Sequence, residues 1–114
     1  MCVKEIGIDI IESERFRRFK DDRNHPFIKK NFSLGEIKYC FGFRDPSPHL
    51  AGIFAAKEAV CKALGGLKIY LPNIEIRHSR EGAPKIYRKR KKLTCMLISI
   101  THTQSVALAV AVKI

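Results

Sequence analysis

Two side chains suited to phosphate chemistry, Glu58 and Lys62, lie four residues apart in a segment with the composition of a helix. At this spacing they stand one above the other on the same face of a helix. A carboxylate can bind a divalent metal or accept a proton, and an ammonium group can bind phosphate. The same spacing is also common in surface ion pairs, which stabilise a helix by about 0.2–0.5 kcal/mol. The pair alone leaves both interpretations open.

The segment that carries this pair is predicted to form one long helix. Residues His49 to Gly66 are rich in Ala, Leu, Lys and Glu, and no Pro interrupts them. Pro48 precedes the segment, and Gly65-Gly66 is typical of a helix end. Lys57 projects into the middle of the apolar face. It either runs its aliphatic stem along the edge of the core or contacts a ligand.

A third candidate, Asp9, lies near the end of a predicted strand over Val3–Ile11. Three isoleucines alternate there with Gly7 and Asp9. Because side chains alternate between the faces of a strand, Asp9 lies on the face opposite the isoleucines. A carboxylate at this position can cap a following helix or bind a metal.

The other elements indicate an α+β domain. Short helices are expected from Ser13 to about Lys20, from Pro26, and after a capping box at Ser33–Glu36. Further strands are expected over Asn73–Ser79, Pro84–Arg88, Leu93–Thr101 and Val106–Ile114. Strands at both ends with helices between them predict a small antiparallel sheet, one long central helix and short N-terminal helices.

A fourth candidate, His102, falls at the junction between the last predicted strand pair and its turn. An imidazole at such a position can bond a backbone carbonyl, or it can reach a ligand and exchange a proton near neutral pH. The sequence pattern alone does not choose between these roles.

Length and charge bound the possible functions. The chain of 114 residues is predicted to be a single domain over residues 1–114, and its net charge of +11 predicts an anionic partner. Nucleic acid, a membrane surface, a phosphorylated ligand or an acidic protein would all fit. No apolar run approaches the ~18 residues of a membrane span, and the charged N-terminus does not resemble a signal peptide. We therefore expect a cytoplasmic protein without a membrane partner.

Three motifs, taken in order, resemble a known signature. The GID of Gly7–Asp9, the FAAKEAVCK of Phe54–Lys62 and the SITHT of Ser99–Thr103 are similar to the motifs of the 4′-phosphopantetheinyl transferases, in particular the holo-(acyl-carrier-protein) synthase type. The resemblance implies that family's fold and its reaction. The 4′-phosphopantetheine arm of coenzyme A is transferred to a serine of apo acyl carrier protein, with Mg²⁺, and 3′,5′-ADP leaves. Such an enzyme supports fatty acid biosynthesis.

The resemblance also implies roles for individual residues. Asp9 and Glu58 match the family's metal ligands, and Glu58 is also a possible base. Lys62 would meet the pyrophosphate or the attacking hydroxyl, and Lys57 would contact phosphate. His102 matches a histidine near the coenzyme A phosphates, in a base or orienting role that stays open.

Partners follow from the same resemblance. Arg15 and Arg18 fall where the family's first helix binds an acidic helix of the carrier protein. The family is typically trimeric, with active sites shared between subunits, so we expect a homotrimer. Ile53 departs from the pattern, because many relatives carry an arginine there. The basic run Arg88–Lys92 also departs from it, because relatives usually have a helix in that region.

Two other functions also fit parts of the sequence. An inactive relative could survive as a coenzyme A binder, for which Ile53 is the argument. A nucleic-acid-binding module could use the +11 charge and the run Arg88–Lys92. However, its basic strands lack the interleaved aromatic residues that bind RNA bases, and it leaves the carboxylates unexplained, so nucleic acid is not the expected partner.

Overall fold

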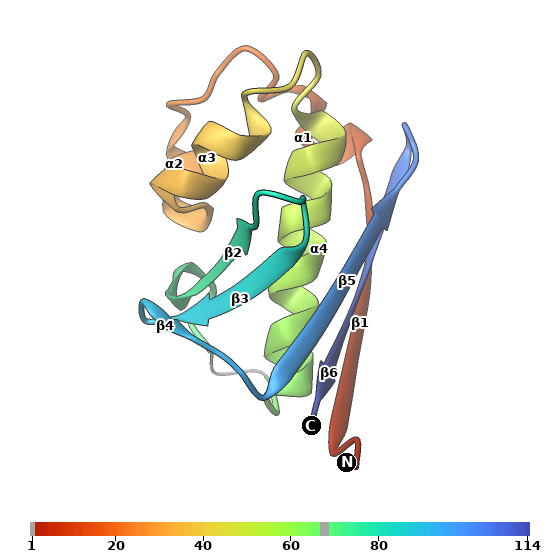
Figure 1. Ribbon diagram of the computed structural model, residues 1–114. Helices are drawn as coiled ribbons and strands as arrows, with labels where there is room; N and C mark the ends of the chain where they lie inside the picture. The colour runs from red at the N-terminus through yellow and green to blue at the C-terminus, as the bar shows by residue number, and fades with distance from the viewer. Residues whose placement is uncertain (1, 67–68) are drawn as a thin grey trace.

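The computed structural model describes residues 2–66 and 69–114, which form two small sheets and a set of helices around one long helix (Figure 1). The elements are β1 (Glu5–Glu12), α1 (Glu14–Arg17), α2 (Pro26–Asn31), α3 (Leu34–Cys40), α4 (Ser47–Ala63), the 3₁₀ turn η1 (Leu71–Asn73), β2 (Ile74–His78), β3 (Pro84–Arg88), β4 (Lys91–Lys92), β5 (Met96–His102) and β6 (Val106–Lys113). The predicted α+β class is confirmed. The expected antiparallel sheet is divided into two three-stranded sheets, β1-β6-β5 and β2-β3-β4.

The β1-β6-β5 sheet has two very different faces. On β1 and β6 its inner face carries mostly small residues, because Gly7 lies opposite Ala111 and Asp9 lies opposite Ala109, whereas β5 adds the larger Ile98 and Ile100 to the same face. Its outer face carries the isoleucines of β1, and Ile6 and Ile10 are each more than half exposed. The alternation expected from the sequence is thus confirmed, and the large apolar side chains point away from this chain's own core.

Helix α4 packs directly on the inner face of this sheet (Figure 1). A Cβ atom on Gly7 would overlap the backbone carbonyl of Ala59 and lie 2.8 Å from the backbone nitrogen of Ala63. The helix therefore approaches β1 more closely than any other residue at position 7 would permit. It ends as expected, with Gly65 and Gly66 at φ values of 92° and 100°.

The N-terminal helices cover one end of α4 with an aromatic cluster. Phe16, Phe19 and Phe32 are buried, and Phe16 lies 5.5 Å from Phe54 of α4 between ring centroids. Both Phe16 and Phe19 of this N-terminal region therefore point into the core. Helix α1 is shorter than expected, and Ser13 does not cap it, because its backbone is helical and its buried hydroxyl makes no capping hydrogen bond.

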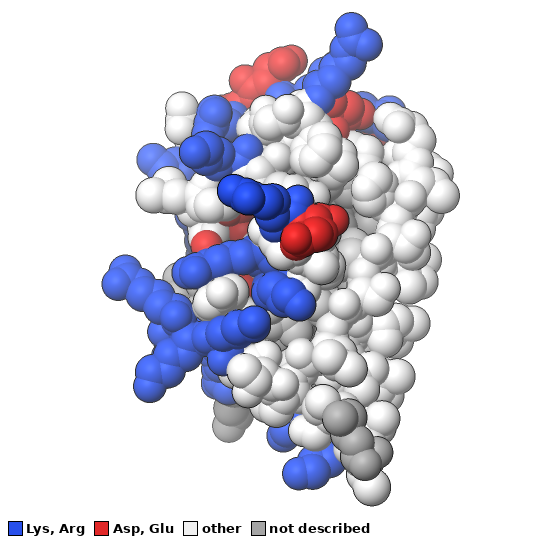
Figure 2. Space-filling model, viewed as in Figure 1, with Lys and Arg blue, Asp and Glu red and all other residues white. Residues whose placement is uncertain are grey.

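The β2-β3-β4 sheet carries much of the positive charge. Figure 2 shows Lys and Arg side chains gathered over these strands, whereas the neighbouring surface beside β5 is nearly all uncharged. The basic run forms the β3–β4 hairpin, in which Arg88 lies opposite Lys91. Its two turn residues, Lys89 and Arg90, have φ values of 49° and 71°, as a tight hairpin turn demands. Within residues 2–66 and 69–114, no helix has the length and apolar character needed to cross a bilayer.

Candidate active site

The close approach of α4 to β1 brings three of the predicted site residues together. Asp9 is on the inner face of β1, and Lys62 is in the last turn of α4. The Lys62 Nζ donates to the Ile8 carbonyl oxygen at 2.9 Å and to Asp9 Oδ1 at 3.2 Å. Strand β1 is an edge of its sheet, so the Ile8 carbonyl is available to a side chain. The structure thus brings Asp9 near the end of β1 next to Lys62 near the end of α4, a proximity that only the family resemblance had predicted.

Glu58 completes this cluster one helical turn from Lys62. Burial raises the pKa of Glu58, and the neighbouring Asp9 carboxylate raises it further, while Lys62 and Arg15 partly oppose that rise. Asp9 Oδ2 is buried and has no hydrogen-bond partner among the described residues. Two close carboxylates, one with an unpartnered buried oxygen, form a site of negative charge that can receive a cation.

One of the two predicted carrier-binding arginines, Arg15, lies near this cluster. Arg15 is close enough to Glu58 to influence its pKa, and its guanidinium carbon is 5.9 Å from the centroid of the Phe54 ring. The Arg18 guanidinium carbon stands 4.6 Å from the Phe19 ring centroid. Both side chains are exposed. Arg15 thus lies near Glu58 and Arg18 packs on Phe19, and neither guanidinium forms a hydrogen bond with the carboxylates.

Lys57, for which the resemblance implied a contact with phosphate, instead points into the core of this chain. Its side chain is fully buried, and its Nζ lies 2.7 Å from Glu36 Oε1 and 2.8 Å from the Asn31 carbonyl oxygen. Glu36 Oε1 also accepts from the backbone N–H of Ser33, and Oε2 accepts from the backbone N–H of Ile76. The ammonium is therefore occupied within the core, and a phosphate could reach it only if this ion pair opened. The direction of Lys57 into the apolar face is explained by a buried partner on α3.

Within a single chain, His102 lies far from the cluster of Asp9, Glu58 and Lys62. It is on β5, and β5 and β1 are opposite edges of the sheet, two strand spacings or roughly 10 Å apart. Helix α4 lies across the inner face between them. The His102 ring instead packs against His49 near the start of α4, at 4.9 Å between ring centroids. His49 and Glu58 are nine residues apart, or roughly 13 Å along the helix axis.

Around His102 the structure shows one aromatic and two imidazole residues that were not singled out from the sequence, together with Ile53, which was. His49, His78, Tyr39 and Ile53 help to line a cavity of about 160 Å³ that His102 also borders. His78 stacks on Tyr39 at 3.9 Å between ring centroids. Burial lowers the pKa of both His49 and His78, so both imidazoles are neutral at pH 7. These residues belong to three separate elements, so no local pattern in the sequence could group them.

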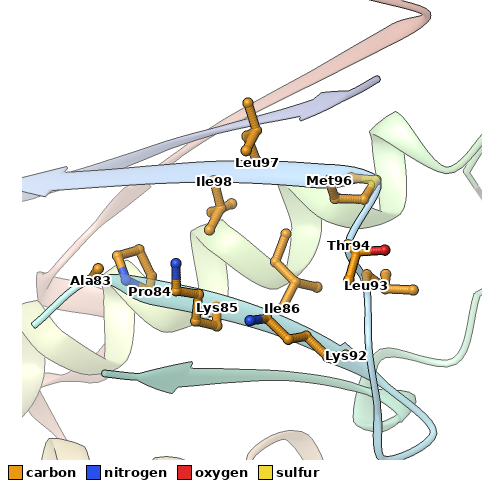
Figure 3. A pocket seen from close by; sticks show the side chains of 10 residues that line it. All are labelled: Ala83, Pro84, Lys85, Ile86, Lys92, Leu93, Thr94, Met96, Leu97 and Ile98. Carbon is orange, nitrogen blue, oxygen red and sulfur yellow. The ribbon is translucent and has the colours of Figure 1, made fainter. Parts of the chain in front are cut away.

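A further groove separates the two sheets (Figure 3). It has a volume of about 350 Å³ and runs between β3 and β5, where Ile86 and Ile98 point towards one another. Lys85 and Lys92 are among its lining residues. Lys92 belongs to the basic run singled out from the sequence, but none of the predicted site residues lines this groove, which is therefore distinct from the carboxylate cluster.

The fold and the cluster together define a class of protein. A long helix packed on an antiparallel sheet holds two carboxylates and a lysine at the sheet edge, an arrangement suited to a phosphate-bearing substrate. The sequence model of the 4′-phosphopantetheinyl transferase superfamily matches residues 5–111. The chain belongs to this superfamily, and its curated relatives show that it is an enzyme of the holo-(acyl-carrier-protein) synthase type.

The individual relatives are similar to this protein over almost the whole chain. The holo-(acyl-carrier-protein) synthase of Thermodesulfovibrio yellowstonii is 41% identical over 113 residues, covering 96% of this chain and 97% of the relative. The crystal structure of the Bacillus anthracis synthase in complex with CoA (3′,5′-ADP) has a TM-score of 0.80 at 30% identity, covering 97% of this chain and 96% of that one. The Helicobacter pylori synthase in complex with coenzyme A has a TM-score of 0.79 at 31% identity, with 96% and 99% covered.

Proposed function

We propose that this enzyme transfers the 4′-phosphopantetheine arm of coenzyme A to a serine of apo acyl carrier protein and so supports fatty acid biosynthesis in the cytoplasm. The serine oxygen forms a bond to the β-phosphorus, the bond from that phosphorus to the bridging oxygen breaks, and 3′,5′-ADP leaves with the bridging oxygen. The observation that carries this proposal is the convergence of Asp9, Glu58 and Lys62 at the edge of β1. Coenzyme A in the structures of related synthases supports the donor substrate.

The same cluster fits a magnesium ion. Mg²⁺ commonly takes one or two carboxylates and completes its octahedron with water and phosphate oxygens. Asp9 and Glu58 would be its protein ligands, because the two carboxylates lie close together, and in the described residues no third His, Cys, Asp or Glu joins them in a metal-binding group. The unpartnered Oδ2 of Asp9 is a coordination position already removed from water. When bound, Mg²⁺ supplies positive charge that neutralises phosphate oxygens.

The chain's own side chains account for the other requirements of the reaction. The Lys62 ammonium, more than half exposed, is placed to bind the pyrophosphate. Glu58 would accept the serine proton, because burial and the Asp9 carboxylate raise its pKa in the metal-free site. His102 would orient the coenzyme A phosphates. The Lys57 contact with phosphate that the resemblance implied is left out, because its ammonium is paired inside the core.

The separation of His102 from the carboxylates supports a shared active site. If His102 acts on the same coenzyme A molecule, it must come from a second copy of the chain. The outer face of the β1-β6-β5 sheet is suited to that contact, since Ile6, Ile10 and Leu97 are each more than half exposed there. Association of three copies through this face gives the proposed homotrimer, with a site at each boundary.

The carrier protein would bind beside the cluster, on Arg15 and Arg18. Both arginines are exposed, Arg15 lies near Glu58, and neither arginine forms an ion pair with a carboxylate in the described part of the chain. The excess positive charge would steer coenzyme A and an acidic carrier protein to the same place. The β3–β4 hairpin adds to that field without entering the site.

The reaction is tested by mass spectrometry of apo acyl carrier protein incubated with coenzyme A, Mg²⁺ and the enzyme. Asp9→Ala and Glu58→Ala should each lower kcat/KM by at least roughly 100-fold, about 2.7 kcal/mol of barrier. Glu14→Ala is the control, because that carboxylate is exposed on α1 and pairs only with Arg17. Coenzyme A binding without any mass gain would identify an inactive relative. Tight RNA binding in ~0.2 M salt would favour the nucleic-acid module.

The trimer is tested by sedimentation. Ile10→Glu should produce monomers and abolish transfer, because it places a charge in the proposed interface. Leu34→Glu is the matched control, since Leu34 is 83% exposed on α3, away from the sheet. A wild-type enzyme that is active as a monomer would refute the shared site.

A further inference from the structure

Lys62 occupies the side of Asp9 that faces solvent. Its Nζ lies 3.2 Å from Asp9 Oδ1, and this side chain is 55% exposed. Asp9 itself is only 18% exposed, and its second oxygen is buried without a partner. A cation that arrives from solution therefore meets an Asp9 carboxylate that already holds an ammonium group.

A divalent cation on Asp9 and an ammonium 3.2 Å from the same carboxylate would repel one another strongly. One of the two must move, and Lys62 is the mobile group. Its aliphatic stem is flexible, and in the described residues its Nζ makes only the contacts with Asp9 and the Ile8 carbonyl. The pair is exposed on the lysine side, so water can solvate the released ammonium, and the divalent cation would take over the Asp9 carboxylate.

The surroundings give Lys62 space to move. A cavity of about 210 Å³ lies along the β1 edge, lined by Ile8, Asp9, Ile10, Lys62 and Leu108. Its walls are mainly isoleucine and leucine side chains, so no other acidic group lines it that could capture the displaced ammonium. A phosphate group entering this region would be the available anion.

We propose that Lys62 is the resident counter-ion of Asp9 in the metal-free enzyme, and that a divalent cation displaces its ammonium, which then becomes available to phosphate. This rests on the proposed function, in which Asp9 is a metal ligand. Lys62 thus has two alternating partners, the Asp9 carboxylate before the metal arrives and the coenzyme A pyrophosphate afterwards. Metal binding would prepare the phosphate site without any movement of the backbone.

The experiment measures Mn²⁺ binding in the absence of coenzyme A, using the electron paramagnetic resonance signal of free Mn²⁺. Lys62→Met removes the competing ammonium and should tighten Mn²⁺ binding at least about fivefold, the lower end of typical couplings between two sites. Lys62→Arg keeps the charge and should restore an affinity close to that of the wild type. Arg15→Met is the matched control, because it removes a positive charge near Glu58 that does not touch Asp9. Its effect should be clearly smaller than that of Lys62→Met.

Asp9→Asn separates the failure of this inference from the failure of the metal site. If Asp9→Asn binds Mn²⁺ like the wild type, Asp9 is not a ligand, and both proposals are wrong. If Asp9→Asn loses binding while Lys62→Met gains no more than Arg15→Met, the metal site stands and the displacement is refuted.

A second readout follows Lys62 directly. In protein labelled with ¹³C at lysine Cε, Mg²⁺ should shift the Lys62 signal and leave that of Lys20, an exposed lysine outside the cluster, unchanged. A Lys62 signal that stays in place at saturating Mg²⁺ would also overturn the proposal.

Discussion

Replacing Lys57 by methionine should destabilise the protein severely while leaving its affinity for coenzyme A unchanged. The substitution keeps the volume of the side chain and removes the only cation that pairs with Glu36 among the described residues. Glu36 is 1% exposed, so water cannot replace the missing ammonium. The variant thus separates the structural role of Lys57 from the phosphate contact that the family resemblance implies.

The size of the stability loss in Lys57→Met follows from the Glu36 charge that is left buried without its partner. Breaking a buried ion pair by removing one partner typically costs about 3–5 kcal/mol. Glu36 keeps the backbone N–H donors of Ser33 and Ile76, so we expect the lower end, about 3 kcal/mol. This is a large share of the roughly 5–15 kcal/mol that separates folded from unfolded domains.

The change of folding stability with pH provides a second test of the role of Lys57. Burial already raises the pKa of Glu36, and loss of Lys57 would raise it further. A raised carboxyl pKa means that the folded state binds more protons than the unfolded state above the unfolded pKa, so stability increases as the pH falls. The stability difference between Lys57→Met and the wild type should therefore narrow from pH 8 to pH 5.

The assay is urea unfolding at one fixed protein concentration, because association contributes to the stability of an oligomer. The double variant Glu36→Gln/Lys57→Met should recover much of the loss, since the amide retains hydrogen bonding without a charge. Lys62→Met is the matched control on the same helix and should cost less than about 1 kcal/mol, as exposed pairs do. A Lys57→Met variant with wild-type stability but a tenfold weaker affinity for coenzyme A would refute this reasoning and restore the phosphate contact.

Three further predictions concern the active site. Gly7→Ala should lower the free energy of unfolding by at least about 2 kcal/mol, because its Cβ meets the backbone of α4, and a smaller loss in urea unfolding would show that β1 can shift. Glu58→Gln should stabilise the metal-free protein at pH 7 by up to about 1 kcal/mol after solvent screening, because burial and the Asp9 carboxylate both disfavour ionised Glu58. The melting temperature should therefore rise, and a lower melting temperature would contradict the raised pKa of Glu58. Reversing both Arg15 and Arg18 to Glu should raise KM for the carrier protein and flatten its salt dependence, with coenzyme A affinity by calorimetry unchanged. Equal loss of both affinities would place α1 in the nucleotide site.

Much of the site could be predicted locally. The alternation in β1 placed Asp9 opposite the isoleucines, and the spacing of Glu58 and Lys62 placed them on one helical stripe, as the structure confirms. The capping box at Ser33 and Glu36 is also present. These features depend on neighbours within a few residues, where backbone geometry alone determines which side chains share a face.

The contacts that these side chains make with residues far away in the sequence could not be predicted from local patterns. Glu36 was expected only to cap α3, yet the same carboxylate neutralises Lys57, which lies 21 residues away. The alternation in β1 likewise did not reveal that its large apolar side chains would face outward. That outcome depends on Gly7 and the alanines of β6, which fit α4 so closely that a larger side chain at position 7 of β1 would meet the helix backbone.

The sequence by itself therefore determined the elements, the faces on which the chemical groups lie, and the family. Only the tertiary structure decided which groups meet. It joined Asp9 to Lys62 and placed His102 at the opposite edge of the sheet. The physical reason is that strand order and helix-on-sheet packing result from contacts between residues far apart in the chain, and local backbone periodicity carries no information about them.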